Sequence, residues 1–200
     1  MSSRCTVLCA RLAWLVLCLP ASTAGLQAQP LHFAAERVVV TAAGQQCSVT
    51  GEYHMRNPGP APVQVALVYP FPVSADQPLP DSVLVEDVLG RTPITHTVMD
   101  SAILFPVRIP PSSTRIYRVS YRQRTPRMRF EYILTTTRRW PLPVGDARFT
   151  IVIPDDLRLR SCVPQPDSVT VGSGRRVYHI ERRQFVSDQN LVVRWERSSR

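Results

Sequence analysis

Histidine, cysteine and serine side chains most often carry out chemistry in proteins, and here their spacing matches no known catalytic arrangement. The four histidines, His32, His54, His96 and His179, form neither an HxxxH nor an HExxH pattern. The nucleophile elbow Gly-x-Ser-x-Gly of serine hydrolases is absent, as is a glycine-rich phosphate loop. We therefore expect no enzyme, no cofactor and no metal. A hydrolase whose residues meet only in the fold stays open as an alternative.

Two short segments contain residues found in reactive or metal sites, yet both have the composition of turns. The segment 172–174, Gly-Ser-Gly, lies between alternating apolar segments at 169–171 and 178–180. A hairpin explains this arrangement better than a reactive serine does. Asp155 and Asp156 suit a turn at a strand end, because a calcium loop needs more oxygen ligands at regular spacing.

Arginine is the only residue of the chain that is always cationic. Lys+Arg total 24 against 15 Asp+Glu, for a formal net charge of +9, and no lysine occurs. So complete a bias points to GC-rich codons, which weakens arguments about single arginines, although the excess charge favours anionic partners. Two alternating segments each place charged residues on one face: Glu52, His54 and Arg56 in the first, and Arg118, Arg122 and Arg124 in the second.

If these two segments are neighbouring strands, their charged faces form a cationic strip. Such a strip would suit an anionic polysaccharide or another envelope polymer. The alternative is a solvated sheet face that keeps the protein from aggregating. Arg138, Arg139 and Trp140 form a second candidate surface, since a tryptophan beside arginines can stack on a sugar or anchor a partner. Its alternative is a tryptophan that closes one end of the core.

Apolar and polar residues alternate with a period of two through most of the chain. From Cys47 to Met55 the odd positions are apolar or small and the even ones polar, as in a half-buried strand. The pattern predicts further strands over 63–71, 82–89, 94–99, 102–109, 114–124, 130–134 and 149–153, and near 169–171, 178–180 and 191–195. The 19 prolines against 8 glycines suit many turns and short strands. We predict an all-β fold, an antiparallel β-sandwich of about a dozen short strands.

Residues 1–24 have the three parts of a signal peptide. Arg4 and Arg11 supply positive charge, 12–19 an apolar core, and 21–24 small residues for processing. The apolar run is shorter than the ~20 residues of a membrane helix; an uncleaved anchor and a lipoprotein are the alternatives. We expect export to the periplasm or the cell exterior, with no membrane span in the mature chain.

The mature chain, residues 30–200, is expected to form one β-sandwich domain. Prolines make 125–143 the place for an internal joint if there are two small units instead. Removal of the leader leaves Cys47 and Cys162. In an oxidising compartment these two predict a disulfide closing a loop of about 115 residues; the alternative is two buried free thiols.

Four segments together resemble the first part of VIT-type domains, the β-rich N-terminal domains of inter-alpha-trypsin-inhibitor heavy chains and related bacterial secreted proteins. The segments are Val49–Asn57, Val68–Pro72, Ile109–Thr114 and Val119–Gln123. They span about half of the chain, but Ser112 stands where that family commonly has glycine. The resemblance implies an exported β-rich domain and carries no catalytic residue.

Strand density without visible chemistry favours an exported, non-catalytic module for protein–protein interaction or assembly. The expected partner is another envelope or extracellular protein, docked on the sheet face or on an edge strand. Binding of an anionic glycan through the arginine-bearing face is the alternative function. Nucleic acid is not expected, because export separates the protein from it.

Overall fold

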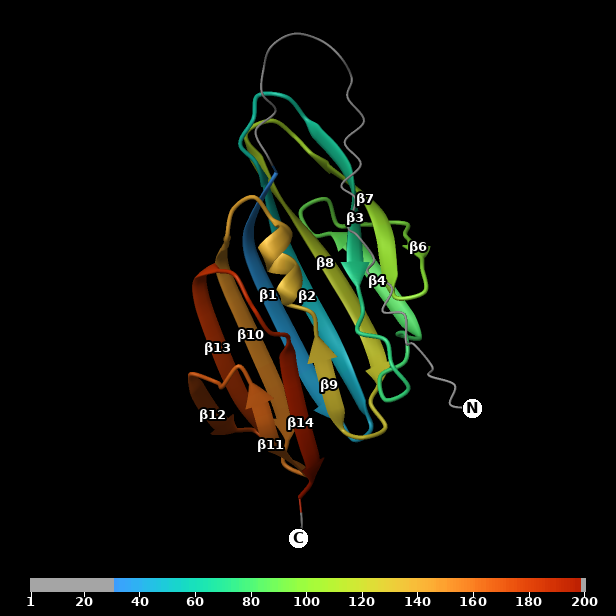
Figure 1. Ribbon diagram of the computed structural model, residues 1–200, viewed down its shortest axis with the longest axis vertical. Helices are drawn as coiled ribbons and strands as arrows, with labels where there is room; N and C mark the ends of the chain where they lie inside the picture. The colour runs from blue at the N-terminus through green and yellow to red at the C-terminus, as the bar shows by residue number, and fades with distance from the viewer. Residues whose placement is uncertain (1–30, 199–200) are drawn as a thin grey trace, which may run out of the picture.

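The structure, a computed structural model, describes residues 31–198 (Figure 1), so the expected signal peptide at 1–24 lies outside the described residues. Its one helical element in this range is the short 3₁₀ helix η1 (Thr135–Arg139). The strands are β1 (His32–Ala43), β2 (Gln46–Asn57), β3 (Val63–Pro70), β4 (Ser82–Asp87), β5 (Thr92–Pro93), β6 (Thr97–Val98), β7 (Ala102–Ile109), β8 (Ser113–Arg124), β9 (Arg129–Tyr132), β10 (Val144–Pro154), β11 (Leu157–Val163), β12 (Ser168–Gly172), β13 (Arg175–Phe185) and β14 (Leu191–Arg197). No helix between residues 31 and 198 is long and apolar enough to cross a membrane.

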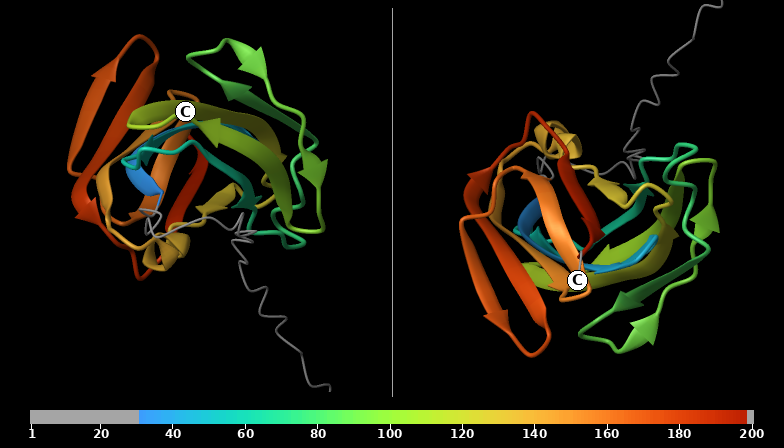
Figure 2. Two further views of the ribbon diagram at one scale, coloured as in Figure 1. Left: turned by 90° about the horizontal axis from the view of Figure 1, so that it is seen from above. Right: turned by 90° about the horizontal axis from the view of Figure 1, so that it is seen from below.

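The strands form one large sheet and two small ones. The eight-stranded sheet has the order β12-β13-β10-β1-β2-β8-β4-β5, and the small sheets are β11-β14-β9 and β3-β7-β6. Figures 1 and 2 show both small sheets on one side of the large sheet, which curls toward them. The all-β prediction is therefore confirmed, with a sandwich-like arrangement around a core between the large sheet and the small ones.

The prediction that all strands are antiparallel is wrong for one central pair. β1 and β10 run parallel, with Val38 opposite Phe149 and Val40 opposite Ile151. The hairpin to β2 fixes β1 on one edge only, so its other edge accepts a strand that arrives from far along the chain. Alternation reports which face is buried and carries no information on strand direction, so the sequence pattern could not reveal this pair.

β1 and β11 were not among the predicted strands, and both contain an irregularity that interrupts the alternation. The register of β1 against β2 shifts between Phe33 and Ala35, and that of β11 against β14 shifts between Leu159 and Ser161. Such a bulge changes which residues face inward after it. In β1 the carbonyl of Ala34 approaches β10 so closely that a Cβ at Gly145 would lie 2.6 Å from it.

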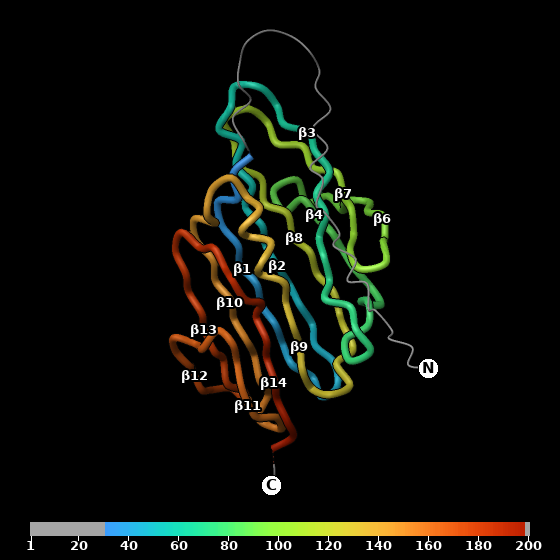
Figure 3. The backbone as a smooth tube through the Cα atoms, viewed as in Figure 1, coloured from blue at the N-terminus to red at the C-terminus, as the bar shows by residue number. Residues whose placement is uncertain are grey.

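The large sheet continues across the segment proposed as an internal joint. Strands β1, β2 and β8 precede the 125–143 segment, while β10, β12 and β13 follow it, and all belong to the same sheet. The segment itself contains β9 and η1, which lie in front of the large sheet in the smooth tube of Figure 3. Contacts between Tyr132 of β9 and Phe149 of β10, with ring centroids 6.4 Å apart, join the layers.

Candidate binding surfaces

The structure brings the two predicted charged segments together on the outer face of the large sheet. β2 and β8 are antiparallel neighbours, with Glu52 opposite Arg118. Arg118 donates to Glu52 Oε1 from Nη2 at 2.8 Å and from Nε at 3.2 Å. Its Nη1 also lies 3.6 Å from Glu86 of β4. The centre of the strip is therefore neutralised by carboxylates, which favours the solvated-face interpretation there, while Arg122 and Arg124 are exposed farther along β8.

His54, His96 and His179 do not meet at one place. His54 and Arg56 lie on β2, and His179 lies on β13, with β1 and β10 between the two strands. His96 lies between β5 and β6. Burial, reinforced by Arg37, lowers the pKa of His54. The described residues contain no group of His, Cys, Asp and Glu able to hold a metal ion.

Trp140 packs into the core, as its alternative interpretation expected. Its ring centroid lies 5.3 Å from that of Phe33, and the side chain is half-buried. The neighbouring Arg138 and Arg139, at the end of η1, are exposed. The tryptophan therefore closes the core and offers little surface for stacking on a ligand.

The expected disulfide is not present. Cys47 on β2 and Cys162 on β11 are both free. Cys47 points into the core from the large sheet, whereas Cys162 lies on a strand of the small sheet β11-β14-β9. Burial raises the pKa of Cys47 to about 12 and that of Cys162 to about 11. Both thiols are free, as in the alternative of two buried free thiols, but only Cys47 is buried and Cys162 is half-buried.

A chain of buried hydroxyls that sequence patterns did not reveal crosses the core. Tyr132 donates to Glu36 Oε1 at 2.6 Å, and its hydroxyl lies 2.8 Å from that of Tyr53, which donates to Tyr69 at 2.9 Å. Burial raises the pKa of Glu36 from 4.5 to about 7 and raises the pKa of all three tyrosines. Gly51 makes room for this chain, because the Tyr53 ring lies where a side chain at position 51 would be. The chain joins three sheets and stabilises their packing.

Strand β12 forms one edge of the large sheet and is exposed to solvent along its whole length. It pairs with β13 alone, and all five of its residues are exposed. Val169 is 52% and Val171 67% exposed, and the strand contains no charged residue. The turn that follows it is the hairpin expected from Gly172–Gly174, with Ser173 and Gly174 at positive φ. Sequence patterning predicted the hairpin but could not show that its first strand lies at an edge.

Comparisons with known proteins identify the fold alone. No family model matches the chain, and no curated protein matches it. A solved structure from Legionella pneumophila, described as a "putative nutrient binding protein", is similar with a TM-score of 0.68 at 14% identity, over 84% of this chain and 67% of that one. An M1 zinc metallopeptidase from Deinococcus radiodurans is similar with a TM-score of 0.50 at 11% identity, over 82% of this chain and 42% of that one. The likeness to VIT-type domains stays a prediction.

Proposed function

We propose that this protein is an exported, non-catalytic interaction module that docks an extended segment of another envelope or extracellular protein on strand β12. The observation that carries the proposal is the fully exposed, uncharged edge of the large sheet. An edge strand presents unpaired backbone N–H and C=O groups, which a partner strand can complete. Main-chain pairing supplies affinity, and the exposed valines supply apolar contact.

The opposite edge of the same sheet supports this choice. That edge ends in β5, which has two residues, one of them Pro93, and its neighbour β4 carries Glu86 and Asp87. Short length, proline and charge are the usual protections against strand addition. β12 has none of these protections, so the two edges differ in the feature that decides whether a partner strand can add.

The charges around β12 suggest the chemistry of the partner. Its neighbour β13 places Arg175 opposite Gly172 and Arg176 opposite Val171. Arg175 is exposed and has no ion-pair partner within the described range, and Arg176 reaches Asp155 only at 4.0 Å. A segment with alternating apolar residues and an acidic end beside Gly172 would meet both features.

The alternative functions have weaker support. An anionic polymer on the predicted strip would have to displace Glu52 and Glu86 from Arg118. A hydrolase of the Ser-His-Asp type would need a histidine beside a nucleophile, yet neither hollow described for residues 31–198 is lined by a histidine.

A peptide-binding assay tests the proposal. The probe is a short synthetic peptide of alternating valine and threonine with glutamate-rich ends, and the same peptide with lysine-rich ends is its charge control. We expect binding of the acidic peptide to weaken at least tenfold in Val171→Lys, because a lysine at the edge opposes strand addition. The matched variant Val98→Lys, at a 59% exposed valine of the two-residue strand β6, should bind like the wild type. Equal binding by both variants, or tighter binding of the lysine-ended peptide, would contradict the proposal.

A further inference from the structure

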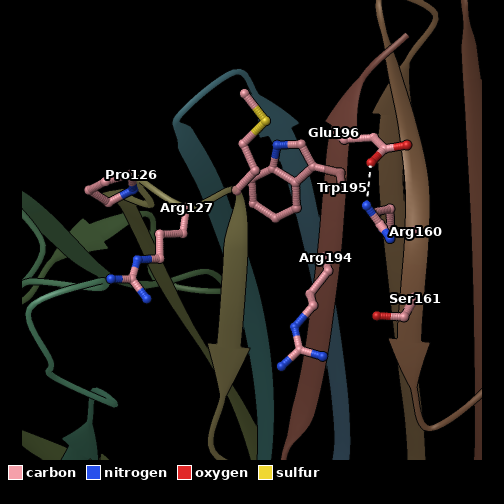
Figure 4. A pocket seen from close by; sticks show the side chains of 8 residues that line it. Pro126, Arg127, Arg160, Ser161, Arg194, Trp195 and Glu196 are labelled. Carbon is pink, nitrogen blue, oxygen red and sulfur yellow. Dashed lines mark hydrogen bonds and ion pairs between the residues drawn. The ribbon is translucent and has the colours of Figure 1, made fainter. Parts of the chain in front are cut away.

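A second surface, which shares no residue with the β12 edge, is a hollow beside the β11-β14-β9 sheet. Its volume is about 720 Å³. Figure 4 shows the side chains that line it, with Arg127, Arg160 and Arg194 arranged around the indole of Trp195. Its volume falls within the roughly 300–1,000 Å³ of sites that hold small molecules.

The three arginines reach this hollow from three separate segments. Arg127 precedes β9, Arg160 lies on β11, and Arg194 lies on β14 between them. Two backbone irregularities flank β14. Arg160 is the extra residue where the β11 register shifts, and Met128 has a φ of 50° while its carbonyl accepts from the backbone N–H of Trp195 at 3.0 Å. Bulges beside a hollow redirect side chains, and are frequent next to functional sites.

The floor of the hollow is apolar and fixed. Trp195 is 3% exposed, and its Nε1 donates to the carbonyl of Gly44 at 2.8 Å, which ties β14 to the turn between β1 and β2. Met128 packs against the core beside it. A buried, hydrogen-bonded indole does not move to meet a ligand, so the arginines around it are held over a rigid base.

The acidic residues nearby leave donor capacity on each arginine. Glu196 accepts from Arg158 and Arg160, and Asp76 lies 3.1 Å from Arg127. Arg194 is exposed and has no acidic partner among residues 31–198. Because a guanidinium has five N–H donors, single-carboxylate pairing leaves Arg127 and Arg160 able to bind a further oxyanion.

We propose that this hollow binds a small ligand carrying two or more tetrahedral oxyanion groups, phosphate or sulfate. Arg194 binds one group from the centre of the hollow, and Arg160 or Arg127 binds the next. Met128, which is half-buried, contacts the uncharged part of the ligand, and the buried Trp195 holds the floor beneath it in place. This site goes beyond docking on β12 and shares no residue with it.

Titration with two probes tests the site and distinguishes the sources of the oxyanion. Tripolyphosphate supplies phosphate groups, and a sulfated heparin disaccharide supplies sulfate groups on a sugar. Calorimetry measures affinity, and tryptophan fluorescence reports on the hollow because Trp195 forms its floor. We expect Arg194→Ala to weaken binding roughly tenfold or more, as the loss of a charge-assisted bidentate contact does.

The matched control is Arg122→Ala, an exposed arginine of β8 on the outer sheet face, where the loss of one charge is the same. In a chain of net charge +9, nonspecific attraction would weaken equally in both variants. Binding of either probe with a selective loss in Arg194→Ala supports the proposal, and the tighter probe names the source. Binding of neither probe, or equal losses in both variants, overturns it. Val171→Lys should leave the titration unchanged, so failure of the β12 proposal and failure of this site are separate results.

Discussion

Two glutamates on neighbouring strands show how the two faces of the large sheet differ. Glu36 on β1 points inward opposite Tyr53, and Glu52 on β2 points outward opposite Arg37. The inner carboxyl is buried and accepts from a neutral tyrosine, whereas the outer one accepts from Arg118. The same functional group therefore has a pKa raised to about 7 on one face and takes part in a partly exposed ion pair on the other. The two carboxyls differ because Glu36 is desolvated with no cation beside it, whereas Glu52 has Arg118.

A row of charged side chains crosses six strands on the outer face of the large sheet. The strand registers place one row of residues side by side: Glu181, Arg148, Arg37, Glu52, Arg118 and Glu86. Acidic and basic side chains are equal in number along this row. The ion pairs in this row join Arg118 to Glu52 and to Glu86, whereas Arg37 lies opposite Arg148. These partly solvated pairs each add little to stability, and the charged row keeps the face hydrated. The inner face tolerates less, because the hydroxyls of Tyr53, Tyr69 and Tyr132 are buried and hydrogen-bonded in one chain with Glu36.

The largest expected effect comes from filling the space that the inner chain needs. In Gly51→Ala the new Cβ would lie 2.6 Å from Cζ of Tyr53 and closer still to its hydroxyl. Tyr53 would have to move and leave the hydroxyls of Tyr69 and Tyr132 without their shared partner. We expect a loss of roughly 3–5 kcal/mol in the free energy of unfolding, from strain plus unpaired hydroxyls. Urea denaturation measures it.

Gly172→Ala is the control for this substitution. Nothing lies within 4 Å of a Cβ at Gly172, so its free energy of unfolding should stay within about 0.5 kcal/mol of wild type. If both alanine variants were equally stable, the tight hydroxyl chain would not be important for the fold.

A smaller effect is expected from the pH dependence of Glu36. Burial raises its pKa in the folded state to about 7, above the ordinary value of 4.5, so the folded state binds the proton more tightly than the unfolded state does. Its contribution is complete below the unfolded pKa and is lost as pH rises from about 4.5 through about 7. The free energy of unfolding lost over this pH range is on the order of 3 kcal/mol, from 1.36 kcal/mol per pKa unit.

Glu36→Gln isolates that contribution. The amide cannot ionise, and its carbonyl still accepts from Tyr132. The free energy of unfolding of the variant should therefore not fall as pH rises, and the variant should be more stable than wild type at alkaline pH. Urea denaturation followed across this pH range, with wild type alongside, measures the difference. Parallel stability curves for the two proteins would show that Glu36 does not titrate with folding.

The comparison of the two faces also explains what the sequence could predict. Glu52 and Arg118 were each predicted to lie on the polar face of a strand because β2 and β8 alternate without interruption, although that β2 and β8 are neighbours was left as a condition. Glu36 and Arg160 were missed because each lies at or just after a register shift, in β1 and β11. A bulge depends on a contact made far away, such as Gly145 beside Ala34, and alternation within one strand does not contain it.

Pairings between distant strands were equally hidden. The hairpin at Gly172–Gly174 was predictable because its turn residues carry the positive φ locally. The parallel pairing of β1 with β10, and the separation of Cys47 from Cys162, depend on the order of strands in the sheets. That order places β12 at an edge, so the surface most relevant to the proposed function could not come from local patterns.

The smallest expected effect is on the outer face. Glu52→Gln removes the ion pair with Arg118 but leaves Glu86 3.6 Å from the same guanidinium, and both members of the pair are about one-third exposed. We expect a loss below about 1 kcal/mol in the free energy of unfolding. The loss should shrink as salt is added, because screening already weakens the pair in the wild type. Urea denaturation at low and high ionic strength measures this loss. A loss as large as that of Gly51→Ala, or one that salt does not change, would contradict the expectation. The outer row would then be as cooperative as the inner hydroxyl chain.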